Sequence, residues 1–102
     1  MNHHLDIIKQ FDKSPDMAAV EKIANNLRLV MAKADARYVA AGDPEELERV
    51  IKNFAMEKLA ASEAAAREAV EKVAQQMKDI HNKDRVAFYY LVAKYLDKLA
   101  SV

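Results

Sequence analysis

The sequence has no cysteine and no tryptophan, one glycine and two prolines among its 102 residues. Without cysteine the chain can form no disulfide framework and carries no thiolate, which suits a reducing compartment. Tight hairpins need glycine and other turn formers, and these are scarce. Alanine is abundant and is the strongest helix former. The composition therefore predicts an all-α protein.

The charge is not one-sided either, because 16 Lys and Arg balance 16 Asp and Glu for a formal net charge of +0. Neutralising several phosphates takes a basic excess or a basic face, so the balance argues against nucleic acid as a partner. Acidic residues slightly exceed basic ones in the first half of the chain, and the reverse holds in the second half. The hydrophobic fraction of 52% can build one core, so we expect a single helical domain over residues 1–102.

Long hydrophobic runs are also missing. The longest uncharged run, at residues 86–93, is well short of the roughly 18 residues of a membrane span. The charged opening segment does not resemble a signal peptide. We expect a soluble, cytoplasmic protein with no membrane partner.

Apolar residues recur at helical spacing and predict a compact bundle of five to six helices. A short helix is expected at residues 4–12, within an N-terminal segment (1–13) that we expect to be loosely attached. Ser14 is the predicted cap of the second helix, because Pro15 and Asp16 follow it and both favour a first helical turn.

The clearest boundary in the chain is at Gly42. We expect Gly42 to end a helix in the left-handed conformation and Asp43 with Pro44 to start the next one. Glu46 is placed to reach back to Asp43 as a capping-box partner. The inward face of this helix is expected to carry Leu47, Val50, Ile51, Phe54 and Leu59.

Two more helices are expected in the C-terminal part. Ser62 is the predicted cap of the first, whose apolar face continues to Ile80. The last helix is expected from about residue 83 to residue 100 and is apolar on most sides between residues 86 and 93. A helix of this kind is normally surrounded by others, so we place the C-terminal helix at the centre of the bundle.

One segment is echoed along the chain: AVEKIANNL at residues 19–27 returns as AVEKVAQQM at residues 69–77. Convergence of two amphipathic helices and duplication of a helix pair both explain the echo. Duplication predicts a break after the first copy, so that the second helix ends near Lys33. A short helix then starts around Asp35 and holds Tyr38 and Val39 inward.

Candidate catalytic and metal-binding groups are few. His3 and His4 lack the helical spacing of metal ligands, and we interpret them as part of a frayed N-terminus. His81 is interpreted as a helix-end residue, and the acidic residues as dipole partners or solvated charge pairs. The sequence offers almost no candidate nucleophile, because it has no cysteine and few serines. We therefore expect no enzyme activity, no metal and no cofactor.

The aromatic run at residues 88–90 lies in the last helix. Successive helical residues point about 100° apart, so the three rings cannot share one core face. In one interpretation they all pack in the core with their hydroxyls hydrogen-bonded. In the other, Tyr89 or Tyr90 together with Tyr95 marks a partner surface.

Residues 34–59, ADARYVAAGDPEELERVIKNFAMEKL, and residues 82–94, NKDRVAFYYLVAK, resemble the small bacterial family known as domain of unknown function 2853. The residues that carry the resemblance are Asp35, Ala36, Val39, Ala40, Asp43, Glu46, Leu47, Val50, Asn53, Phe54, Lys58, Leu59, Asn82, Arg85, Phe88, Tyr89, Tyr90, Leu91 and Ala93. The resemblance implies a compact helical bundle from a bacterium, and it supplies no activity, cofactor or partner.

Two hypotheses for function come from different classes. The first is a non-catalytic protein-interaction or structural module, including self-association as a homodimer through the wide apolar arc of the last helix. The second is a small-molecule-binding or regulatory bundle with an aromatic-lined pocket, on which Asn53 or Arg85 converges. The candidate surface or pocket comprises Tyr38, Asn53, Phe54, Arg85, Tyr89, Tyr90 and Tyr95.

Overall fold

The computed structural model describes residues 3–28, 32, 38–80 and 83–102. The elements are α1 (His3–Phe11), α2 (Met17–Asn26), α4 (Pro44–Arg49), the π-helix η2 (Val50–Met56), α5 (Glu63–Gln76), α6 (Arg85–Tyr95) and the 3-10 turn η3 (Leu99–Ser101). Within these ranges the only β-type pairing is an isolated bridge between Tyr38 and Asp84. The predicted all-α class is confirmed.

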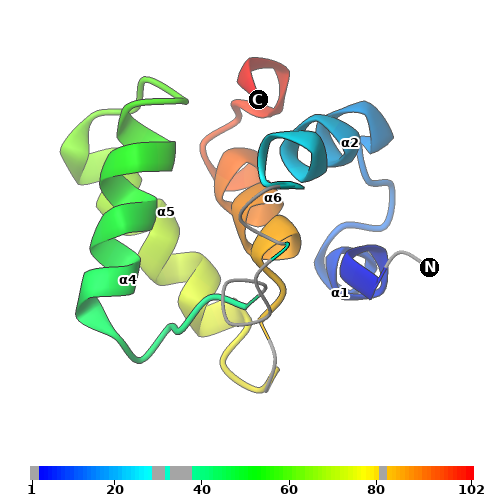
Figure 1. Cartoon of the computed structure of the whole chain (residues 1–102), viewed down its shortest axis with the longest axis horizontal. Coiled ribbons are helices and arrows are strands. Elements are labelled where there is room, and N and C mark those ends of the chain that lie inside the picture. The colour runs from blue at the N-terminus through cyan, green and yellow to red at the C-terminus, as the bar shows by residue number, and fades with distance from the viewer. Residues whose placement is uncertain (1–2, 29–31, 33–37, 81–82) are drawn as a thin grey trace.

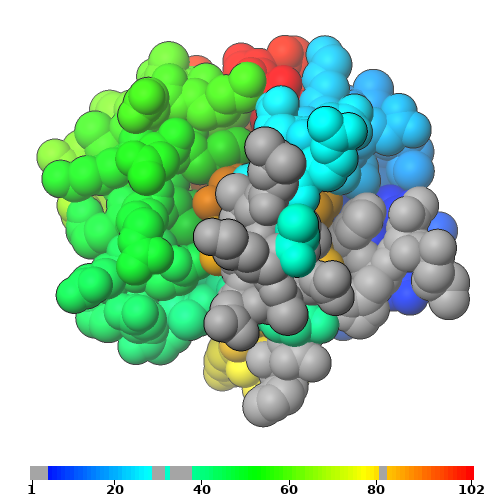
Figure 2. Space-filling model, viewed as in Figure 1, coloured from blue at the N-terminus to red at the C-terminus, as the bar shows by residue number. Residues whose placement is uncertain are grey.

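Helix α6 lies at the centre of the bundle, with α1 and α2 on one side and α4 and α5 on the other (Figure 1). In the space-filling view only a few orange atoms of α6 reach the visible face (Figure 2). Its most deeply buried residues are Val86, Ala87, Phe88, Tyr90, Val92 and Ala93. The prediction of a central C-terminal helix is confirmed, and the reason is that apolar residues surround most of its circumference.

The last helix is shorter than the predicted range of residues 83–100. The Asp84 side chain caps its start by accepting a hydrogen bond from the backbone N–H of Ala87 at 3.1 Å. At the other end, Asp97 takes a left-handed conformation with φ of 57°, which a helix cannot continue through. The chain then resumes as η3.

Helix α1 buries Ile7 and Ile8, which are 4% and 0% exposed, against the core, although the sequence predicts a loose attachment for this segment. The start of α2 differs from the prediction. Its cap is Asp16, whose carboxylate accepts from the backbone N–H of Ala19 at 3.1 Å. The Ser14 cap is therefore wrong; the Ser14 N–H instead donates to the carboxylate of Asp12.

Helix α2 ends at Asn26, seven residues before the predicted end at Lys33. The expected short helix near Asp35 falls outside the described residues. The expected inward orientation of Tyr38 is wrong, because Tyr38 is 39% exposed, whereas Val39 is 4% exposed as predicted. The Val39 N–H donates to the Lys83 carbonyl, which aligns this segment with the start of α6.

The Asp43–Pro44 helix start is confirmed, because the Asp43 carboxylate accepts from the backbone N–H of Glu45 at 3.0 Å. The left-handed conformation expected at Gly42 is wrong, since Gly42 has no positive φ. That conformation occurs instead at Ala60, with φ of 59°, after the chain has left η2. The helix therefore ends before Leu59, which is buried in the turn that follows.

Helix α5 starts at the predicted cap, where Ser62 Oγ accepts from the backbone N–H of Ala65 at 3.2 Å. It ends at Gln76, short of the predicted extension to Ile80. The two echoed segments take the same local structure: Leu27 and Met77 both cap their helices with an N–H bonded to the carbonyl four residues earlier. Both helices pack against α6.

Candidate functional site

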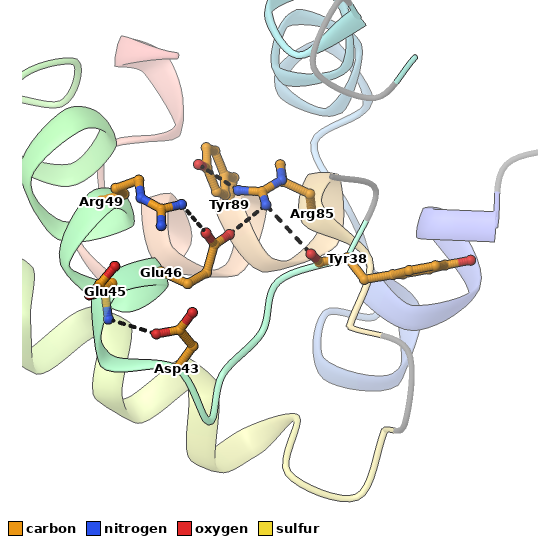
Figure 3. A network of polar contacts seen from close by, with 7 residues as sticks. All are labelled: Tyr38, Asp43, Glu45, Glu46, Arg49, Arg85 and Tyr89. Carbon is orange, nitrogen blue, oxygen red and sulfur yellow. Dashed lines mark hydrogen bonds and ion pairs between the residues drawn. The ribbon is translucent and has the colours of Figure 1, made fainter. Parts of the chain in front are cut away.

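Glu46 is the centre of a polar network at the start of α4 (Figure 3). Its carboxylate accepts hydrogen bonds from Arg85 on α6 at 2.5 Å and from Arg49 one turn later at 2.9 Å. The side chains of Glu46 and Arg85 are only 10% and 11% exposed. The predicted capping-box role of Glu46 is therefore wrong: its side chain points into the bundle and not back to Asp43.

The Arg85 guanidinium connects α6 to α4, through Glu46, and to the segment at Tyr38. Arg85 Nη1 donates to the Tyr89 hydroxyl at 3.2 Å, and Nη2 makes a longer contact of 3.5 Å to the backbone carbonyl of Tyr38. The Arg85 guanidinium carbon also lies 5.8 Å from the centre of the Tyr89 ring, within the range of a cation–π contact. Arg85 thereby fixes the position of the Tyr89 ring.

Burial by itself disfavours the charged form of Arg85 and lowers its pKa, but the hydrogen bond to Glu46 and the contact with Tyr89 outweigh it, so the net pKa is raised. Arg85 stays protonated at any pH at which the protein is folded. The Arg85 guanidinium is therefore a permanent positive charge in this network and does not exchange a proton near neutral pH.

Tyr89 stacks on Phe54 of η2, with ring centres 4.4 Å apart and an angle of 31° between the planes. This is a close, tilted aromatic contact, at the short end of the distances that favourable ring pairs adopt. Because one edge of Tyr89 is bound to Arg85 and one face lies against Phe54, the ring is held on two sides. Tyr89 is half-buried, so part of it remains open to solvent.

An open cleft of about 250 Å³ lies between the end of α2, η2 and α6. We call it the aromatic cleft. Its described lining has an apolar part and a polar part, formed by Ile23, Asn26, Leu27, Asn53, Phe54, Lys58 and Tyr89.

The π-helical turn of η2 supplies part of this lining. A π-helix is rare, and it occurs frequently at functional sites because it re-aims side chains that a regular helix would turn elsewhere. Here η2 contains both Asn53 and Phe54, and Lys58 is the second residue after its end. The local backbone therefore decides which side chains line the aromatic cleft.

Tyr90 does not belong to the aromatic cleft. It is 0% exposed, and its hydroxyl donates to Asp12 at 2.7 Å while accepting from the backbone N–H of Asp16 at 2.8 Å. Burial and then the hydrogen bond to Asp12 raise the pKa of Tyr90 to about 12. Tyr90 thus fixes the α1–α2 connection to α6.

Two other predicted site residues lie apart from the aromatic cleft. The ring of Tyr38 extends away from the Arg85 network, and only its backbone carbonyl takes part (Figure 3). Tyr95 is 42% exposed and donates its hydroxyl to Glu68 at 2.6 Å. Of the predicted residues, the structure brings together Asn53, Phe54 and Tyr89, with Arg85 in contact with Tyr89.

Sequence reasoning missed Glu46 and the remaining lining residues of the aromatic cleft. Glu46 lies four positions before Val50, on the inward side of its helix. That spacing was a signal, although acidic residues in a first helical turn have an ordinary explanation in the helix dipole. Asn26 carried no comparable signal, because it is a single polar residue near a helix end. Lys58 is one of the residues that carry the family resemblance, but the resemblance assigns it no role.

Within the described ranges, no group of three or more His, Asp and Glu is placed to hold a metal ion. Over the same ranges, none of the helices combines the length and apolar character of a bilayer crossing.

The fold and the site together define a small all-α bundle with a buried ion pair behind a solvent-open aromatic cleft. The chain belongs to the family described as protein of unknown function (DUF2853), whose family model matches residues 2–100. No curated protein matches the chain significantly. The resemblance noted in the sequence is confirmed, and it extends over nearly the whole chain.

Proposed function

We propose that this protein is a non-catalytic binding module that holds a small molecule in the aromatic cleft. The observation that carries the proposal is the cleft itself, where the exposed part of the Phe54–Tyr89 pair lies beside three polar side chains. Ligand sites are typically concave and mostly apolar, with a few placed polar groups. The aromatic cleft has this composition.

The rigidity of one wall also supports binding. Tyr89 is held by Arg85 and Phe54, and Arg85 is held by Glu46. A wall that is already ordered loses little conformational entropy when a ligand arrives. The aromatic cleft is therefore preorganised on the side of α6.

The non-catalytic part of the proposal rests on composition and on the protonation of the network. The chain has no cysteine, and the Arg85 guanidinium behind the aromatic cleft stays charged across the physiological range. A general acid or base needs a pKa near the working pH. The absence of cysteine also supports our placement of the protein in the reducing cytoplasm of a bacterium.

The structure favours this function over a protein-interaction module. The wide apolar arc that suggested self-association is covered by α1, α2, α5 and η2 within the same chain. The large exposed hydrophobic residues of the described ranges are Met17, Tyr38 and Tyr95. Such single exposed residues are normal on a protein surface and do not indicate an interface by themselves.

The test uses the whole protein, isotope-labelled, with indole and phenol as neutral aromatic probes. Amide chemical shifts are followed by two-dimensional NMR as each probe is added. We expect saturable shifts at the aromatic cleft, centred on Asn53 and Tyr89. Saturation distinguishes a site from nonspecific adsorption on apolar surface.

A matched pair of variants locates the site. Asn53→Trp places a large ring in the aromatic cleft, whereas Lys52→Trp adds the same ring at the neighbouring exposed position outside the lining. We expect Asn53→Trp to weaken binding of indole about 10-fold and Lys52→Trp to leave it unchanged, because a filled cleft loses its contacts. Equal binding by both variants, or no saturable shift in the native protein, would refute the proposed function.

A further inference from the structure

We infer that the aromatic cleft selects a planar ligand bearing a negative charge, such as an aromatic carboxylate. This inference rests on the proposed function and adds the chemical class of the ligand. Three features of the aromatic cleft support the inference. They are the sign of the charge in its lining, the lack of hydrogen-bond partners for its polar side chains among the described residues, and its size and apolar surface.

The lining carries charge of one sign only. Lys58 contributes an ammonium group, and none of the described lining residues is acidic. Electrostatic complementarity acts chiefly on selectivity, because a ligand of the wrong sign is repelled and one of the right sign is favoured. Lys58 therefore repels a cation and attracts an anion.

The polar side chains of the lining are available to a ligand. Within the part of the chain that the structure describes, the side chains of Asn26, Asn53 and Lys58 make no hydrogen bond or ion pair. By contrast, several charged side chains elsewhere are bound to other residues, as Arg67 is bound to Glu48 and Glu63. An amide offers N–H donors to an anion, and an ammonium offers donors together with charge.

The apolar part of the lining favours a flat ligand. Phe54 and Tyr89 contribute aromatic surface, and Ile23 and Leu27 add aliphatic surface. A planar ring can pack on such surface while its charged substituent contacts one of the polar side chains. The volume of about 250 Å³ is below the roughly 300–1,000 Å³ of sites for drug-sized ligands, which points to one ring or a fused pair with a short acidic arm.

The experiment compares two acids with their uncharged amides: phenylacetate with phenylacetamide, and indole-3-acetate with indole-3-acetamide. Dissociation constants for the whole protein are measured by NMR titration at fixed low salt near neutral pH. Each pair has the same ring and arm, so that only the charge differs. We expect each acid to bind about 5-fold more tightly than its amide, the upper range for a solvent-open ion pair.

Three variants locate the effect. Lys58→Gln removes the charge from the aromatic cleft and is expected to erase the preference, so that each acid binds no more tightly than its amide. Lys58→Arg should retain the preference. Lys52→Gln removes the same charge from η2 outside the lining, and Lys94→Gln removes one beside a smaller cleft that includes Phe11 and Tyr95. Both of these controls should keep the full preference.

The possible outcomes separate the two proposals. Equal binding of acids and amides at the aromatic cleft would overturn the charge selection and leave the proposed function standing. A preference that is lost in Lys94→Gln and kept in Lys58→Gln would overturn the assignment to the aromatic cleft. Absence of saturable binding by all four probes would overturn both the inference and the proposed function.

Discussion

Glu46 and Arg85 form an ion pair across 39 positions of the chain, with their side chains 10% and 11% exposed. The pair joins the first turn of α4 to the first turn of the central helix. It also continues through the Tyr89 hydroxyl to the wall of the aromatic cleft. The packing of the two halves of the bundle and the shape of the candidate site therefore depend on the same contact.

Replacing Arg85 by Met is expected to lower the free energy of unfolding by about 2–3 kcal/mol, because it removes the main partner of a buried carboxylate. Arg49→Met is the matched control, since Arg49 binds the same carboxylate with a side chain that is 59% exposed. It should cost less than about 1 kcal/mol. Urea unfolding followed by circular dichroism measures both.

A double variant tests the origin of that cost. Replacing Glu46 by Gln in the Arg85→Met protein removes the buried charge, so part of the lost stability should return. If the double variant is as unstable as the sum of its single variants, the pair contributes little and the loss comes from packing of the Arg85 side chain alone.

The Tyr90 hydroxyl joins α6 to the α1–α2 connection through Asp12 and the backbone of Asp16. Tyr90→Phe keeps the ring and removes these hydrogen bonds at a fully buried position. We expect a loss of about 1–2 kcal/mol in unfolding free energy. Tyr95→Phe removes an exposed hydroxyl bound to Glu68 and should produce no measurable change; equal losses in both variants would contradict the assigned role of Tyr90.

Tyr90 also predicts a pH dependence at alkaline pH. Its pKa of about 12 in the folded protein lies above the ordinary value of about 10 that applies to the unfolded chain. The unfolded chain therefore releases this proton first as the pH rises, so the contribution of Tyr90 is complete below about pH 10 and is lost between about pH 10 and pH 12.

Lysines titrate in the same range, so the measured quantity is the difference in unfolding free energy between the native protein and Tyr90→Phe. This difference should shrink as the pH rises through that window. Equilibrium unfolding at about pH 9 and about pH 11.5, on either side of the ordinary tyrosine pKa of about 10, measures this difference. If the difference is the same at both pH values, the pKa of Tyr90 is not raised in the folded protein.

The architecture could be predicted from the sequence because it follows from local patterns. Ser62, Asp43 and the apolar run of α6 act on their own neighbours along the chain, through capping and helical periodicity. The same local reasoning failed at Ser14, because two residues later Asp16 offers a longer-range contact with Tyr90 as well as a cap. Ser14 and Asp16 are both suitable residues to cap α2, and the tertiary contact with Tyr90 favours Asp16.

The site could be predicted only in part. Phe54 and Tyr89 could be identified because aromatic residues are few in this sequence, and Asn53 because it is one of the residues that carry the family resemblance. The pairing of Glu46 with Arg85 depends on how two helices meet, and η2 is a π-helix in a stretch whose periodicity suits an ordinary α-helix. The local sequence pattern determines neither the Glu46–Arg85 pairing nor the π-helical form of η2, so neither could be predicted from it.

The caps of α6 and α4 provide a final comparison, because Asp84 and Asp43 perform the same task at positions of different burial. Asp84 is 5% exposed and caps the central helix, whereas Asp43 is exposed and caps a helix on the outside. Replacing Asp84 by Ala leaves a buried N–H of Ala87 without its acceptor and should cost about 2 kcal/mol. Asp43→Ala leaves the N–H of Glu45 open to water, so its cost should be below about 1 kcal/mol. Thermal and urea unfolding of the two variants measures both values, and a larger loss at Asp43 would mean that burial does not set the importance of a cap in this bundle.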